Sequence, residues 1–242
     1  MDQLKRISTL TGWLWIITFI TSIPARFIFY APILNEPNYV TGAGDAARAL
    51  IGLGAVFELF LIISNVGTAV VPYSVHKRYS EVGAVAYVTA RVMESVFIAV
   101  GIICLLAVAT LRQDAPTGVT PALGQGIEAI NEWSFRLGPG FIVGVGNGLI
   151  LGYMMYKSGL VPRRLAMIGL IGGPLLILGA ILLTFDVIEE SIHGLMSLPE
   201  AVWELSLGIY LVVKGYRRDA PVLAVDAPVA MLDTPSAATT LR

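Results

Sequence analysis

The chain has 242 residues, of which 56% are hydrophobic and 14% are charged, and its formal net charge is −1. Soluble domains are about 45–50% apolar and about 25% charged, so this chain has too little polar surface to cover a water-soluble globule. The composition argues against a soluble enzyme, and the absence of a basic excess argues against a nucleic-acid-binding protein. The single cysteine, Cys104, excludes an intrachain disulfide and a cysteine-rich metal site.

Six segments are long and apolar enough to cross a bilayer, which takes about 20 residues in a helix. Membrane-barrel strands are far shorter, at about 10 residues, and alternate in polarity. We therefore predict an all-α, polytopic membrane helix bundle within residues 1–218, in contact with the lipid bilayer. The six predicted spans cover residues 10–34, 47–73, 82–111, 139–156, 165–185 and 195–213.

Basic residues alternate with acidic or mixed connections along the chain. Lysine and arginine in short loops favour the cytoplasmic side of a membrane, so this alternation predicts that both termini are cytoplasmic. The basic positions are Lys5 and Arg6, His76 to Arg78, Lys157, Arg163 and Arg164, and Lys214, Arg217 and Arg218.

Three segments have a distinct character. Lys5 and Arg6 precede the apolar first span, an arrangement also found in signal peptides. No A-x-A cleavage site comes after it, so we expect an uncleaved anchor. Residues 127–137 have the spacing of a short amphipathic helix, which we expect at the outer membrane interface. Residues 219–242 are rich in alanine, proline, valine and threonine without a period, and they predict a disordered cytoplasmic tail.

A glycine stripe runs along the fourth predicted span. Residues four apart share one face of a helix, and glycines there let another backbone approach closely. The stripe predicts tight helix packing, either inside one molecule or as a seam for a second copy or another membrane protein. It consists of Gly140, Gly144, Gly148 and Gly152.

Ionisable and amide side chains inside the spans are the candidate functional residues. Such groups are costly in lipid, so they face the bundle interior and find partners. Most lie about nine to twelve residues from a span end, or about 14–18 Å at 1.5 Å per residue, which is near the middle of a core about 30 Å thick. The predicted cluster consists of Glu58, Asn65, Arg91, Glu94, Asn147 and Glu204, with Arg26 reaching inward from nearer the outer end of the first span.

This cluster has a structural and a functional interpretation. Arg91 and Glu94 are three residues apart and can pair on one side of a helix, so the cluster can simply fix helix register. The cluster contains three glutamates and two arginines, however, so one carboxylate has no arginine to balance its charge. A buried unpaired carboxylate takes up a proton or binds a cation, as proton-coupled carriers require.

Other chemistry has little support in the sequence. It contains no HExxH, GxSxG or CxxC motif, and the two histidines, His76 and His193, fall near opposite membrane faces. We therefore assign no catalytic residue, metal or cofactor. Aromatic residues near span ends, including Trp15 and Tyr30, are expected at the membrane interfaces.

Several short motifs together resemble one family, the domain-of-unknown-function 4386 family of bacterial membrane proteins. The resemblance extends over about residues 7–218 and implies a bacterial cell-membrane protein of six or seven spans, without a reaction or substrate. The motifs are TSIPA at 21–25, GTAVV at 67–71, Arg91 with Glu94, LGPGF at 137–141, YKSGLVPR at 156–163, LIGGP at 170–174, and VWELSLG at 202–208 with KG at 214–215.

Three functions follow as hypotheses. The first is a carrier for a small molecule or ion, linked to protons, in which Glu58, Glu94 or Glu204 titrates, Arg91 tunes it, and Asn65 and Asn147 line the path. The second is a membrane scaffold or accessory subunit whose cluster is structural. The third is an intramembrane enzyme acting on lipid. A cavity that connects the cluster to water favours the first, and a sealed, fully paired cluster favours the second.

Overall fold

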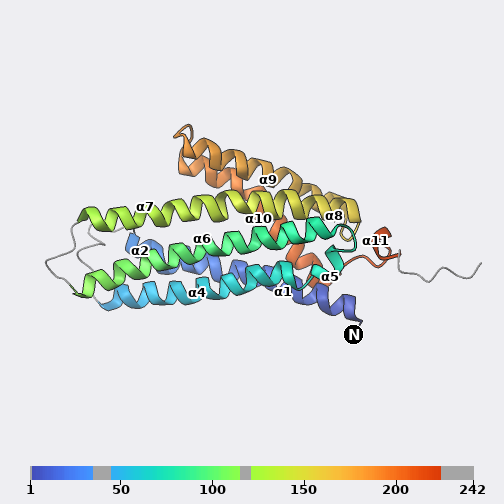
Figure 1. Cartoon of the computed structure of the whole chain (residues 1–242), viewed down its shortest axis with the longest axis horizontal. Helices are drawn as coiled ribbons and strands as arrows, with labels where there is room; N and C mark the ends of the chain where they lie inside the picture. The colour runs from blue at the N-terminus through green and yellow to red at the C-terminus, as the bar shows by residue number, and fades with distance from the viewer. Residues whose placement is uncertain (1, 35–44, 115–120, 225–242) are drawn as a thin grey trace, which may run out of the picture.

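The computed structural model describes residues 2–34, 45–114 and 121–224, and every regular element within them is helical. The elements bundle lengthwise, with the α9–α10 hairpin leaning away from α4, α6 and α7 (Figure 1). In chain order they are α1 (Gln3–Pro24), η1 (Ala25–Tyr30), α2 (Ala31–Leu34), α4 (Asp45–Val70), α5 (Tyr73–His76), α6 (Glu81–Asp114), α7 (Pro121–Leu137), η2 (Gly138–Ile142), η3 (Gly144–Leu151), α8 (Gly152–Ser158), α9 (Arg163–Thr184), α10 (Glu190–Val213) and α11 (Pro221–Ala224).

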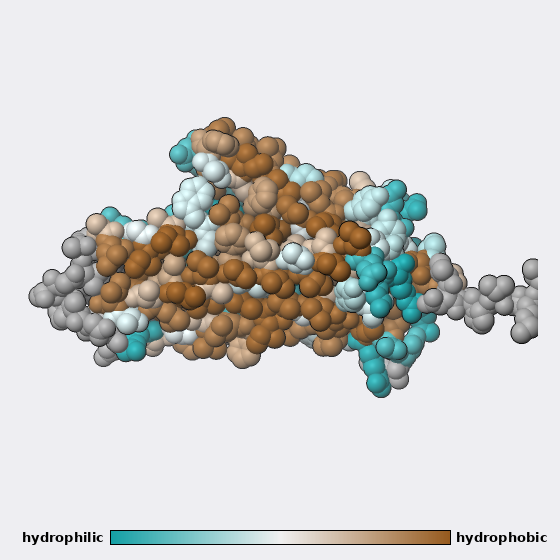
Figure 2. Space-filling view, in the orientation of Figure 1, coloured by the Kyte–Doolittle hydropathy of each residue, from teal (hydrophilic) through white to brown (hydrophobic). Residues whose placement is uncertain are grey.

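Six helical stretches in the described ranges are long and apolar enough to cross a membrane, which confirms the predicted all-α membrane bundle. Hydrophobic residues cover the sides of the long helices, and hydrophilic residues gather mainly at the end that carries α5 and α8 (Figure 2). The six stretches are Gln3–Tyr30, Arg48–His76, Glu81–Leu111, Ala122–Ser158, Arg163–Thr184 and Glu190–Val213.

The basic residues lie at one end of the bundle, which we call the basic end. It holds the start of α1, the α5 turn, α8 and the residues after α10 (Figure 1). Lys77, Lys157 and Lys214 are exposed there. The turn between α9 and α10 and the start of α7 lie at the other end, which we call the distal end.

The fourth span differs from its prediction. Residues 127–137 are helical as predicted, but they do not form a separate surface segment, because α7, η2, η3 and α8 follow one another as one stretch, Ala122–Ser158. Two polar residues of α7, Asn131 and Ser134, are buried against α6 rather than facing water, and Asn131 donates a hydrogen bond from Nδ2 to the Gly101 carbonyl at 3.2 Å. Pro139, which lacks an N–H, lies in a π-helical turn between two glycines, so it does not break the helix.

Glycines set the closest helix contacts. A Cβ added at Gly144 would lie 2.8 Å from the Gly173 carbonyl of α9, and one at Gly148 would lie 2.8 Å from the Gly173 nitrogen. Near the basic end, a Cβ added at Gly12 of α1 would lie 2.6 Å from the Gly208 carbonyl of α10. These helices can approach backbone to backbone only because the side chains are absent.

The predicted glycine stripe therefore contacts this same chain along most of its length. Gly144 and Gly148 face Gly173, Gly152 faces the backbone of α9 at Leu170, and Gly140 faces His193 of α10. Within the described residues, α9 and α10 occupy the face that the sequence offered as a seam for a partner.

Two aromatic residues expected at the membrane interface are buried instead, so that expectation was wrong. Trp15 is 1% exposed and lies under the Arg91 guanidinium, with 4.9 Å between the Arg91 Cζ and the ring centroid. Tyr30 is 3% exposed and points to Glu58. Both residues contact charged side chains in the interior of the bundle rather than lipid headgroups.

The predicted tail lies mostly outside the described residues, which end at 224. Its first part is described: Ala220 is buried against the hydrophobic core at the basic end, and Pro221–Ala224 form the short helix α11.

Candidate functional site

Arg91 is at the centre of a closed polar cluster between α4 and α6. Its Nη1 donates to Glu94 Oε2 and its Nη2 donates to Asn65 Oδ1, each at 2.6 Å. The Asn65 Nδ2 donates to Glu94 Oε1 at 2.9 Å, which closes a three-membered ring of side chains. The Arg91 Nε donates to the Asn65 carbonyl and to the Thr68 hydroxyl. We call Asn65, Arg91 and Glu94 the clasp.

The clasp is buried and internally satisfied. Arg91 is 2% exposed, Glu94 5% and Asn65 1%. Arg91 and Glu94 pair at i and i+3 on α6, as their spacing indicates. A pair of opposite charges can be buried in a low-dielectric site when most of its hydrogen bonds are made, whereas an isolated charge cannot.

Glu58 lies apart from the clasp, on α4. Its Oε2 accepts a hydrogen bond from the Tyr30 hydroxyl at 3.0 Å. Tyr30 can reach it because its ring lies against the bare backbone of Gly54, one turn before Glu58, where an added Cβ would lie 2.6 Å from the Tyr30 Cζ. Among the described residues no cation forms an ion pair with Glu58.

Glu204 of α10 pairs with an amide rather than with a cation. Its Oε1 accepts a hydrogen bond from the Asn147 Nδ2. Asn147 lies in the π-helical segment η3, and its carbonyl accepts the indole N–H of Trp203 at 3.1 Å. π-helical turns within α-helices are frequent at functional sites. The Asn147 Oδ1 is buried and has no hydrogen-bond partner in the described chain.

Glu200 is the residue that the sequence reasoning missed. It lies one turn before Glu204 on α10, is 2% exposed, and both of its carboxylate oxygens are buried without a hydrogen-bond partner in the described part of the chain. Its Oε2 lies where the side chains of Gly148 and Gly172 would otherwise be. The signal was present, because Glu200 and Glu204 are four residues apart and share a helix face.

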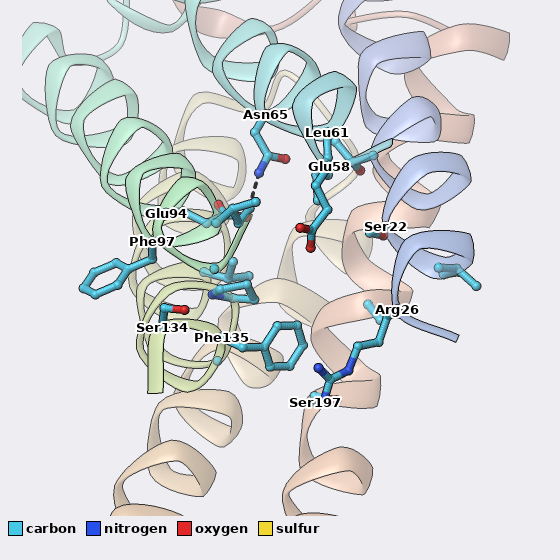
Figure 3. A pocket seen from close by; sticks show the side chains of 18 of the residues that line it. Ser22, Arg26, Glu58, Leu61, Asn65, Glu94, Phe97, Ser134, Phe135 and Ser197 are labelled. Carbon is cyan, nitrogen blue, oxygen red and sulfur yellow. Dashed lines mark hydrogen bonds between the residues drawn. The ribbon is translucent and has the colours of Figure 1, made fainter. Parts of the chain in front are cut away.

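A cavity of about 540 Å³ joins these groups. All six spans contribute to its wall, and it extends from the exposed Glu190 and Gly194 near the distal end to the buried Arg91. Figure 3 shows Glu58 and Glu94 on facing sides of the space, with Phe135 and Arg26 on the side away from Asn65. Its charged lining residues are Arg26, Glu58, Arg91, Glu94, Glu190, Glu200 and Glu204.

Arg26 reaches the same cavity, but not as the partner of a carboxylate. Its guanidinium lies over the Phe135 ring at 4.7 Å from the centroid. No described acidic side chain forms an ion pair with it. The structure thus brings six of the seven predicted cluster residues to one cavity wall, and the seventh, Asn147, contacts that wall through Glu204.

Polar side chains continue from the clasp toward the basic end. The Thr68 hydroxyl lies 3.4 Å from the Tyr87 hydroxyl, and the His76 Nε2 lies 3.1 Å from the Tyr216 hydroxyl. His76 is 2% exposed, and its Nδ1 has no hydrogen-bond partner among the described residues. Burial raises the pKa of Tyr216, so its hydroxyl keeps its proton.

Among the residues that the structure describes, no three histidine, cysteine, aspartate or glutamate side chains gather as a metal site would need.

The family model for a domain of unknown function, DUF4386, matches residues 10–215. The chain belongs to this family. No curated protein and no solved structure matches the chain. The family description names no activity, so the function of this DUF4386 protein has to be inferred from the chemistry of its cavity.

Proposed function

We propose that this DUF4386 protein is a carrier for a small molecule or ion whose movement is linked to protons. The observation that supports this most directly is the cavity, which extends from exposed residues at the distal end to buried carboxylates. A purely structural clasp has no need of such an opening. A volume of about 540 Å³ lies within the range of about 300–1,000 Å³ typical of small-molecule sites.

The charges of the cavity suit proton coupling. The clasp neutralises Glu94 with Arg91, whereas Glu58, Glu200 and Glu204 have no ion-pair partner among the described residues. Glu200 and Glu204 are neighbours on one helix face, and two carboxylates so close do not readily ionise together. One of the pair then holds a proton when the site is empty and releases it when a cation arrives.

We place the carrier in a bacterial cell membrane with its basic end in the cytoplasm. The gathering of lysine and arginine at that end supports this orientation, and the family resemblance supports the bacterial source. In this orientation the cavity opens to the outside, and the polar side chains from Thr68 to Tyr216 lie on the cytoplasmic side of the clasp.

Transient currents after a pH step test this proposal without knowledge of the cargo. The full chain is reconstituted in proteoliposomes on a solid support, and the outer pH is stepped. Proton binding to buried carboxylates moves charge, so a transient current larger than that of protein-free liposomes is expected. E200Q and E204Q should each reduce it, whereas E132Q, which removes an exposed glutamate on α7 outside the cavity, should not. Currents equal to those of protein-free liposomes would contradict the proposal.

A scaffold or accessory subunit is the second candidate. The clasp supports it, because all three of its members are hydrogen-bonded to one another and buried. In that case the pH step gives no protein-dependent current, while the clasp variants still lose stability.

A further inference from the structure

The geometry points to an organic cation with an apolar body as the cargo of this cavity, an inference that rests on the proposed carrier function. The cavity combines an excess of negative charge with aromatic walls, and each feature recognises one part of such a molecule.

The charge of the lining favours a cation. Two guanidinium groups, those of Arg26 and Arg91, face five carboxylates, and Arg91 is already paired within the clasp. A cationic ligand would supply the missing positive charge, whereas an anion would add to the excess negative charge in a poorly solvated space. The five carboxylates belong to Glu58, Glu94, Glu190, Glu200 and Glu204.

The walls favour an apolar body over a bare metal ion. Four phenylalanines line the cavity together with aliphatic residues such as Leu61 and Ile98. Aromatic faces attract organic cations, most strongly where water is excluded. A metal ion would require several convergent oxygen ligands, and the described residues do not converge in that way. The four phenylalanines that line the cavity are Phe19, Phe27, Phe97 and Phe135.

Glu58 is the carboxylate best placed to hold the charged end. One of its oxygens accepts a hydrogen bond from the Tyr30 hydroxyl, which fixes the Glu58 side chain. Figure 3 shows the Glu58 carboxylate pointing into the cavity. It is half-buried, so a ligand can reach it, whereas Glu94 is held by Arg91 and Asn65. Phe135 has the Arg26 guanidinium over its face, so this ring already makes a cation–π contact at the cavity wall.

Tetraphenylphosphonium is the probe, because it is a permanent cation with an apolar aromatic body. Its binding to the full chain in nanodiscs is measured by equilibrium dialysis against empty nanodiscs, with tetraphenylborate as an anion of the same shape. We expect saturable binding of the cation alone. E58Q should weaken it about tenfold, as loss of a buried charge partner does, and F135L should weaken it about threefold. E132Q is the matched control and should bind as the unmodified chain does.

The outcomes separate this inference from the proposed function. Binding of the cation no greater than to empty nanodiscs, equal binding of tetraphenylborate, or unchanged binding in a folded E58Q variant overturns the cation inference. If pH-step currents persist in that case, the carrier proposal stands and only the cargo class is wrong. If the currents are absent as well, both fail. A melting curve for each variant shows that it is folded, and E58D should retain part of the binding if E58Q does not fold.

Discussion

The Tyr30 hydroxyl and the Glu58 carboxylate lie 3.0 Å apart, although 28 residues separate them along the chain. The contact joins η1 to α4 at the wall of the cavity and gives Glu58 its fixed position. The ring passes over Gly54, so three residues act together: a glycine that makes room, a tyrosine that donates, and a glutamate that accepts.

Replacing Tyr30 by phenylalanine should separate the role of this hydrogen bond from the packing of the ring. A single hydrogen bond contributes about 1 kcal/mol net, so Y30F should melt close to the unmodified chain while binding tetraphenylphosphonium about fivefold more weakly. G54A should have the same effect on binding, because its Cβ displaces the ring. Unchanged binding in both variants would show that Glu58 does not need Tyr30.

Removing Arg91 should be among the most damaging changes in the bundle. R91A leaves the Glu94 carboxylate buried without its counter-charge, which costs about 3–5 kcal/mol. We expect a large decrease in the melting temperature in detergent. Thermal unfolding monitored by tryptophan fluorescence measures it. The double variant R91M/E94M removes both charges and should recover much of that loss. A melting temperature that R91A leaves unchanged would show that the clasp does not hold α4 and α6 together.

The glycine contacts predict a contrast between two alanine substitutions. G148A places a Cβ 2.8 Å from the Gly173 nitrogen and from Glu200 Oε2, so it should destabilise the bundle by about 1–3 kcal/mol. G52A on α4 meets nothing within 4 Å and should be neutral or slightly stabilising. Thermal unfolding of the two variants side by side measures the difference, and equal melting temperatures would refute the close α9 contact.

Much of this architecture follows from local rules. Six long apolar runs define the six spans, and the i, i+3 spacing of Arg91 and Glu94 gives their ion pair. The four-residue glycine period indicates a close backbone contact but not the helix that makes it, because that choice depends on tertiary packing.

The remaining details depend on contacts between distant segments. Tyr30 has the position of an interfacial tyrosine, and only the fold shows that it reaches Glu58. Residues 127–137 have an amphipathic period, but Asn131 and Ser134 face α6 and the cavity rather than water. Glu200 lies near the expected end of a span, and its depth in the bundle follows from the start of α10 at Glu190, ten residues earlier.

The carrier function requires that water reach the cavity, and cysteine labelling measures this access. In a C104S background, S22C places a thiol on the cavity wall beside Glu58, and T89C places one on an exposed face of α6 outside the cavity. Sealed vesicles are treated with a cationic, membrane-impermeant methanethiosulfonate from one side at a time. We expect S22C to react only from the distal side and T89C to react from neither side. A thiol at position 22 that is unreactive from both sides would mean that water does not reach the carboxylates, and the carrier proposal would then be wrong.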